Sequence, residues 1–119
     1  MSVLRRLSCC LAALLFVACG GKPEDTQLVV YTARAEHLIQ PLLLRYTEET
    51  SVPIRFVTDK AGPLLARLAA EGEATQADVL ITVDAGNLWQ AAQQGLLQVI
   101  DSPVLEANVR AHLRDPEDR

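Results

Sequence analysis

The sequence predicts an α/β fold, a three-layer parallel-sheet lobe built from three successive strand–loop–helix units (βαβαβα). Short Val-rich apolar runs at 28–31, 54–57 and 78–82 indicate the strands, because strands covered on both faces carry nearly continuous apolar sequence. Each run is followed by a polar loop and then by a segment with helical spacing of apolar residues. Strands that alternate with helices in this way require parallel pairing with right-handed crossovers.

The first unit joins the strand at 28–31 to the polar loop Thr32–His37, which holds a cation, a carboxylate and an imidazole between two apolar segments. After this loop Leu38, Leu42 and Tyr46 recur at helical spacing, which predicts an amphipathic helix. A loop between a parallel strand and the amino end of a helix offers free N–H groups and a partial positive charge. Such loops are therefore suited to ligand binding.

The ends of this first helix are predicted from proline and serine. Because Pro41 lacks an N–H and is tolerated best near a helix start, the regular helix is predicted to begin as late as Gln40. The helix is expected to run to about Thr50. Ser51 then stands where glycine is usual, which predicts a strained or frayed exit.

In the second unit, Arg55 lies within the strand at 54–57 and is expected to reach solvent at a sheet edge. The loop at 58–62 leads into Pro63, which is suited to the first position of a helix because its missing N–H is not needed there. Gly72 near the end of that helix can take the left-handed conformation that stops it.

The third strand, 78–82, has the most continuously apolar sequence and is predicted to be the most clearly buried of the three. Its loop at 83–87 opens a helix that Gly95 closes. Residues 96–100 are expected either to add a short strand or to pack over the helices, and residues 104–113 to form one or two helical turns. Three such units would place three loops along one edge of one sheet, where we expect the function.

The amino terminus has the pattern of an export signal. Arg5 and Arg6 precede the apolar run Leu7–Val17, which is too short to span a bilayer but suits the apolar part of a signal peptide. Ala18 before Cys19 resembles a bacterial lipoprotein cleavage box, which predicts that Cys19 is lipidated. The alternative is a buried core helix with an incidental cysteine.

These patterns divide the chain into a lipoprotein signal peptide at 1–18, a lipid-anchored tether at 19–26, an α/β ligand-binding lobe at 27–101 and an exit segment at 102–119. Loss of the signal leaves nine basic and fifteen acidic residues, a net charge of −6 with histidine neutral. An acidic exported chain without a basic cluster argues against a nucleic-acid partner. We expect it in the periplasm or cell envelope, held at the outer or inner membrane by the lipid.

Five passages resemble the amino-terminal lobe of the bacterial ferric-iron-binding periplasmic proteins, the substrate-binding components of iron(III) ABC transporters. They are 29–39 (VVYTARAEHLI), 58–62 (TDKAG), 77–89 (ADVLITVDAGNLW), 101–106 (DSPVLE) and 112–117 (HLRDPE). The resemblance implies a type 2 periplasmic-binding-protein-like fold of which this chain is an incomplete first lobe, with the second lobe absent. It further implies that Fe³⁺, with carbonate or another synergistic anion, is captured between two lobes and delivered to the transporter permease.

The first loop contains three candidates. Arg34 is a candidate for binding a synergistic anion, with a surface ion pair to Glu36 as the alternative. Glu36 and His37 are candidate metal ligands, since hard Fe³⁺ takes carboxylate and imidazole ligands, although a carboxylate at a helix start is favoured by the helix dipole in any case. Several family members have a histidine where this chain has Ala35, so His37 is the candidate that would replace that histidine as a ligand.

Thr32, Lys60 and Asp84 are the other predicted ligand or anion contacts, on the three loops. Lys60 and Asp84 each have an alternative reading. Lys60 is typical of a solvated pair with Asp59, and Asp84 of ordinary helix capping. Tyr31 before the first loop is expected to be a packing residue.

Other functions are compatible with this sequence. One is a receptor for another small anion or metal complex, and another is a non-functional lipid-anchored fragment. An enzyme is not expected, because the chain has no nucleophile elbow, phosphate-binding glycine loop or metal-hydrolase motif. A single lobe is expected to bind Fe³⁺ weakly or not at all, because it cannot enclose the ion or exclude water.

Overall fold

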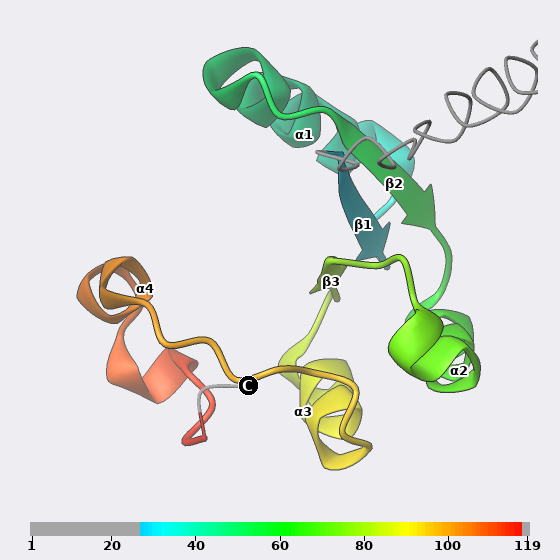
Figure 1. The fold of residues 1–119 in the computed structure, drawn as a ribbon, viewed down its shortest axis with the longest axis vertical. Helices are drawn as coiled ribbons and strands as arrows, with labels where there is room; N and C mark the ends of the chain where they lie inside the picture. Colours follow the sequence, from blue (N-terminus) through cyan, green and yellow to red (C-terminus); the bar gives the residue numbers. More distant parts are fainter. Residues whose placement is uncertain (1–26, 118–119) are drawn as a thin grey trace, which may run out of the picture.

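A computed structural model describes residues 27–117, in which three strands form one sheet in the order β2-β1-β3. The strands are β1 (Leu28–Thr32), β2 (Ile54–Thr58) and β3 (Val79–Ile81), and β1 runs parallel to both of its neighbours (Figure 1). The predicted parallel sheet is therefore confirmed. The predicted signal peptide, the lipidated Cys19 and the whole tether at 19–26 lie outside the described residues.

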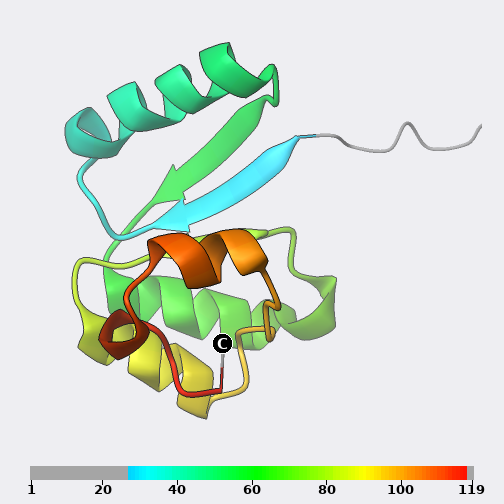
Figure 2. The ribbon, with the colours of Figure 1, turned by 90° about the vertical axis from the view of Figure 1, so that its left-hand side faces the viewer.

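The helices cover both faces of the sheet. Helix α1 lies on one face, and α2 and α3 lie on the other, so the lobe has three layers (Figure 2). This arrangement follows from the right-handed crossover rule, because β1 connects to β2 on one side while β2 connects past β1 to β3 on the other. The bounds are α1 (Glu36–Thr50), α2 (Ala61–Glu71), η1 (Gly72–Ala74), α3 (Ala85–Gln93), α4 (Pro103–Asn108) and η2 (Ala111–Leu113).

The core lies mainly between β1 and α2, where Val29 and Tyr31 pack with Leu64 and Leu68. Val30, the residue between them, is also buried and faces the opposite side of the sheet, which α1 covers. Strand β1 is thus covered on both faces, as its apolar sequence predicts. Within residues 27–117 no helix is both long and apolar enough to cross a membrane.

The prediction for the start of the first helix is wrong. Helix α1 begins at Glu36 and contains Pro41 in its second turn. Pro41 cannot donate to the carbonyl of His37, four residues earlier, but His37 is exposed and water can reach that carbonyl. The predicted strained exit is confirmed, because Ser51 has a left-handed φ of 61°.

The apolar residues whose spacing predicts helix α1 do not form its buried face. Ile39 and Leu43 are its buried residues, whereas Leu42 is 61% exposed, and Leu38 and Tyr46 are exposed as well. The helix carries two adjacent apolar stripes, and only the stripe of Ile39 and Leu43 faces the sheet. The other stripe is open to solvent in the part of the chain that the structure describes.

The strand at 78–82 is not the most buried. Strand β3 covers only Val79–Ile81 and forms an edge of the sheet, and Val79 is 37% exposed. The most buried strand is β1, because it has neighbours on both sides. An apolar sequence indicates a strand but does not determine its place in the sheet order.

The remaining expectations concern element ends. Pro63 is the third residue of α2 rather than the first. Gly72 ends α2 as predicted, but its φ of 52° and ψ of −133° lie outside the left-handed helical region that was expected. Residues 96–100 form no strand, and Leu96 packs against the core, while residues 104–113 do contain helical turns in α4 and η2. Arg55 reaches solvent on the edge strand β2, as expected.

Candidate functional site

The carboxyl ends of the three strands lie level with one another. Thr32 at the end of β1 is paired with Thr58 of β2 on one side and with Ile81 of β3 on the other. The pairing continues into the loops, since the Asp59 amide donates to the Thr32 carbonyl at 3.2 Å and the Ala33 amide donates to the Ile81 carbonyl at 2.7 Å. The three loops that follow the strands therefore lie side by side, as predicted.

We call this edge the rim and define it by residues 33–37, 59–60 and 82–84. At the rim the chain leaves β1 toward α1 on one face of the sheet and leaves β3 toward α3 on the other (Figure 2). In open α/β sheets, ligands bind outside the carboxyl ends of strands at the point where neighbouring connections diverge in this way. The gap between the β1–α1 and β3–α3 loops is such a point.

The first loop presents an unpaired cation. Arg34 is exposed, and within residues 27–117 its guanidinium forms no ion pair, so the predicted alternative of a pair with Glu36 is not formed. Glu36 and His37 are the first two residues of α1 and are also exposed. Ala35 at the helix start offers no side-chain cap, which leaves the first N–H groups of α1 open to solvent or to a ligand.

The second loop is similar. Lys60 precedes α2 without capping it by its side chain, and its backbone amide donates to the Asp59 carboxylate at 2.6 Å. Both side chains are exposed. In the described part of the chain the Lys60 ammonium forms no ion pair. The predicted alternative, a side-chain pair of Lys60 with Asp59, is therefore not formed, and the two residues are joined only through the Lys60 backbone amide.

Asp84 on the third loop caps helix α3. One carboxylate oxygen accepts from the Asn87 backbone amide at 2.9 Å, and the other accepts from the Asn87 side-chain amide at 2.6 Å. These hydrogen bonds, the backbone one first, hold the pKa of Asp84 below its usual range. The capping reading is confirmed. The Asp84 carboxylate lies at the positively polarised amino end of α3, whereas no side chain caps the amino end of α1 or α2.

Thr32 is fully buried, and its hydroxyl accepts a hydrogen bond from the Arg34 amide at 3.1 Å. This contact shapes the turn that carries Arg34. Thr32 therefore positions the loop through its hydroxyl. A direct contact between Thr32 and a ligand stays a prediction.

Within residues 27–117 no group of three or more His, Cys, Asp or Glu side chains is arranged to hold a metal ion. Glu36 and His37 supply at most two ligands from this side, short of the number that encloses a cation. A metal held at the rim would need further ligands from an anion or from protein on the opposite side of the cleft.

Tyr31 does not contribute a phenolate to the rim. Its hydroxyl donates to both carboxylate oxygens of Glu71 at 3.0 and 3.1 Å. Because α2 starts at the rim and ends at Glu71, this bond directs the phenol away from the rim. Burial, together with the Glu71 carboxylate, raises the pKa of Tyr31, which favours the neutral phenol. The predicted packing role is confirmed.

The polar cluster around this phenol was not predicted from the sequence. Arg67 forms an ion pair with Glu71 at 2.7 Å and lies over the Tyr31 ring, 4.7 Å from its centroid. Thr75 of the following turn donates to the same carboxylate at 2.7 Å. The i, i+4 spacing of Arg67 and Glu71 is typical of an ion pair on one helix face. Their contacts with Tyr31 of β1 depend on the packing of α2 against the sheet and have no such local signal.

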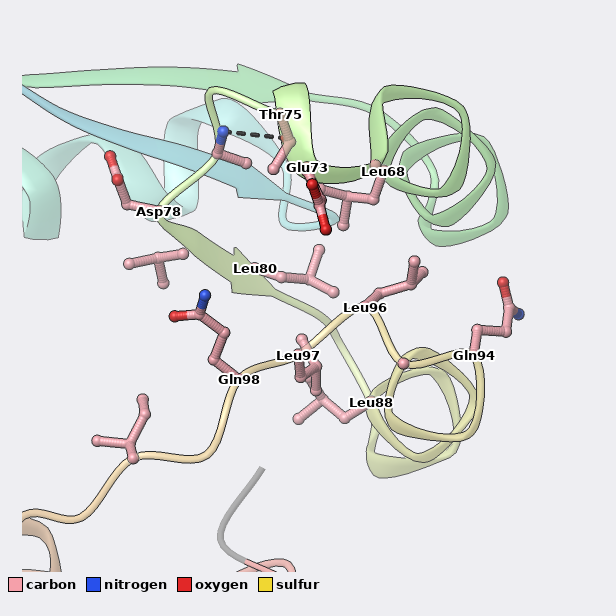
Figure 3. A pocket seen from close by; sticks show the side chains of 15 residues that line it. Leu68, Glu73, Thr75, Asp78, Leu80, Leu88, Gln94, Leu96, Leu97 and Gln98 are labelled. Atoms are coloured by element: carbon pink, nitrogen blue, oxygen red, sulfur yellow. Dashed lines mark hydrogen bonds between the residues drawn. The ribbon is translucent and has the colours of Figure 1, made fainter.

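A hollow in the described part of the chain lies away from the rim, beside β3. It is a groove of about 1050 Å³ between the free side of β3, the end of α2, and the segment after α3 (Figure 3). None of the predicted site residues lines it. We call it the β3 groove.

No family model matches the chain. Iron uptake protein A1 of Synechocystis sp. is 34% identical over 112 residues, covering 87% of this chain and 31% of that protein. The structure of Trichodesmium IdiA/FutA in complex with iron and citrate is 36% identical in sequence and superposes with a TM-score of 0.72. The match covers 77% of this chain and 29% of the Trichodesmium chain.

A Bordetella ferric binding protein is 42% identical in sequence, with a TM-score of 0.71. That match covers 76% of this chain and 29% of the Bordetella chain. This chain thus spans about a third of the length of the relatives it matches. Their sheet and helix arrangement agrees with the three-layer lobe described above. The resemblance predicted from the sequence is confirmed: over most of its length the chain is similar to one part of the bacterial ferric-iron-binding proteins and has their periplasmic-binding-protein-like fold.

Proposed function

We propose that this chain serves as the first lobe of the substrate-binding component of an iron(III) ABC transporter. The observation that carries the proposal is its similarity to ferric-iron-binding proteins over about three quarters of its length. The level strand ends support it, because they gather three loops into one rim where a ligand between two lobes would lie. Delivery of iron to a membrane permease is part of the same proposal.

At the rim, Arg34 and Lys60 would bind an anion that accompanies the iron, such as carbonate or citrate. Both side chains are exposed and free of ion pairs in the described residues. Guanidinium and ammonium groups bind carboxylates through charge-assisted hydrogen bonds, bidentate for arginine. Glu36 and His37 would be the metal ligands of this lobe, and Thr32 and Asp84 would hold the loops in place.

We further propose that the mature chain is periplasmic and held to a membrane by lipid on Cys19. The support is the sequence around the cysteine and the basic start of the chain, both outside the described residues. Labelling with a palmitate analogue in a Gram-negative host tests the anchor. Cys19→Ala is expected to abolish the label, and label on C19A would contradict the assignment.

A chimeric receptor tests the main proposal. In iron uptake protein A1, the stretch that matches this chain is replaced by residues 27–117, and ferric citrate binding is followed by tryptophan fluorescence. Arg34→Gln and Lys60→Gln are each expected to weaken ferric citrate binding about tenfold, the loss of one charge-assisted contact. Arg45→Gln removes another exposed cation, one that pairs with Glu49 on α1 away from the rim, and is the control.

If R34Q and K60Q bind ferric citrate as R45Q does, the rim assignment is wrong. If a folded chimera binds no iron at all, the receptor assignment itself fails.

A receptor for another small anion is the second candidate. The observation that favours it is a rim with two free cations and, within residues 27–117, no cluster of three metal-ligating side chains. Titration of the chimera with citrate alone separates the two readings. Comparable binding of citrate without iron would favour the anion receptor, and a strict need for iron would favour the ferric receptor.

A further inference from the structure

The three loops of the rim differ in what they offer to a ligand. The first two loops carry the exposed cations Arg34 and Lys60, and no side chain caps the amino end of α1 or α2, the helices that follow them. These loops therefore present positive charge and free N–H groups. The third loop, residues 82–84, has no basic side chain, so its contribution to binding must be of a different kind.

The polar side chains of the third loop bond within the loop and to the helix after it. The Thr82 hydroxyl donates to the Asp84 carbonyl at 2.7 Å. The Asp84 carboxylate accepts from the backbone and side-chain amides of Asn87. The fit is close, because a Cβ added at Gly86 would lie 3.2 Å from Asp84 Oδ1. Both polar side chains are therefore already engaged in fixing the shape of the loop.

Val83 is 51% exposed, and among the residues that define the rim it is the one large apolar side chain. Single exposed valines are ordinary on protein surfaces, but Val83 has a particular place. The hydrogen bond from the Ala33 amide to the Ile81 carbonyl holds its loop against the loop that carries Arg34. A ligand bound by Arg34 therefore has apolar surface beside it.

On the basis of the function proposed above, we propose that Val83 is a specificity-determining contact and that the rim takes an anionic ferric complex whose chelator has flat apolar surface, as in a catecholate. Catecholate oxygens are hard ligands that suit Fe³⁺, and three of these dianions around one ion leave a strongly anionic complex. The charge complements Arg34 and Lys60. The rings pack on an isopropyl group and on the plane of a guanidinium. Citrate has the charge but only methylene groups as apolar surface.

The test uses the full 119-residue chain, isotope-labelled, with gallium tris-catecholate, gallium citrate and catechol alone as probes. Gallium(III) stands in for iron(III) because it is diamagnetic and is not reduced by catechol. Nuclear Overhauser effects between the ring protons and the Val83 methyl groups report the contact, and amide shifts at the rim report the affinity. We expect these effects, and a dissociation constant for the catecholate complex at least about tenfold below that for gallium citrate.

Two valine variants and one arginine variant separate apolar contact from charge. Val83→Thr keeps the β-branched shape and is expected to weaken gallium catecholate binding about fourfold, the effect of losing one buried methyl group, with gallium citrate unchanged. Val99→Thr makes the same substitution at a valine that is 67% exposed and outside the rim, and is expected to change neither. Arg34→Gln is expected to weaken both complexes, because both are anionic.

The proposal is overturned if V83T binds gallium catecholate as V99T does, if gallium citrate binds as tightly as the catecholate complex, or if catechol alone shifts the same amides. Weaker citrate binding in R34Q without any preference for catecholate would remove this inference and leave the proposed receptor function standing. Binding of neither complex would overturn the rim assignment as well. If V83T fails to fold, the Overhauser effects to Val83 in the parent chain still decide.

Discussion

The backbone amide of Ala33 donates a hydrogen bond of 2.7 Å to the carbonyl of Ile81, across 48 positions of the sequence. This bond joins the start of the first loop to the end of β3. It fixes the β1–α1 loop, with Arg34, next to the β3–α3 loop, with Asp84. The Asp59 amide makes the equivalent bond to Thr32 on the other side. The rim is therefore held by backbone pairing and does not depend on its side chains.

The orientation of α1 can be tested with neighbouring leucines. Leu43→Ala is expected to lower the free energy of unfolding by about 2–5 kcal/mol, because Leu43 is buried against the sheet. Leu42→Ala on the same turn is expected to change it by less than about 0.5 kcal/mol, because Leu42 is largely exposed. Urea unfolding followed by circular dichroism measures both. Equal losses would show that α1 packs differently.

The exit of α1 offers a stabilising substitution. Ser51 has a φ of 61°, a conformation that costs a residue with a Cβ about 1 kcal/mol relative to glycine. Ser51→Gly is expected to raise the free energy of unfolding by about that amount, seen as a higher urea midpoint. Ser51→Ala is the control and is expected to give no gain. A destabilised S51G would contradict the left-handed exit.

The cluster around Glu71 predicts a dependence of stability on acid. The hydrogen bond from Arg67, followed by that from Thr75, lowers the pKa of Glu71 below its unfolded value of 4.5. Stability from the ionised carboxylate is therefore present above about pH 4.5 and is lost as the pH falls through the lower folded value. Melting temperatures measured from pH 7 to pH 3 are expected to fall less steeply for Glu71→Gln. An unchanged slope in E71Q would contradict this linkage.

Tyr31 gives a test at the other end of the pH range. Tyr31→Phe removes the hydrogen bond to Glu71 and is expected to cost about 1 kcal/mol. Because the folded pKa of Tyr31 lies above its unfolded value of 10.0, its contribution is complete below that pH and is lost as the pH rises through the folded value.

Ferric citrate binding by the chimera is expected to be the same in Y31F as in the parent. A loss of iron binding in Y31F, without loss of folding, would make Tyr31 a ligand and contradict its structural role.

Much of the fold was predictable because its signals are local. The three strands, their loops and the stops at Ser51 and Gly72 follow from apolar runs and from the conformations those positions require. The capping role of Asp84 was also predictable, since it depends on Asn87 three residues later. The adjacency of the loops followed from the parallel-strand rule, which is general to alternating units.

Other features could not be predicted because they depend on distant parts of the chain. The buried side of α1 is chosen between two apolar stripes by the sheet beneath it, and α1 itself does not contain that information. The exposure of β3 depends on whether a strand lies beyond it. The Tyr31–Glu71 hydrogen bond joins residues 40 positions apart. The ligand roles of Arg34, Glu36, His37 and Lys60 stay predictions, since they depend on groups across the cleft.

The most direct test of the rim is paramagnetic broadening of backbone amide signals in the full chain. Ferric citrate is added to the isotope-labelled protein, with diamagnetic gallium citrate as the control, so that even weak binding is located. We predict selective broadening of amides in residues 33–37, 59–61 and 82–85, with those around Ser51 and Glu71 at the opposite end unaffected. Broadening centred near Glu71 or on the β3 groove, or uniform broadening throughout, would contradict a binding site at the rim.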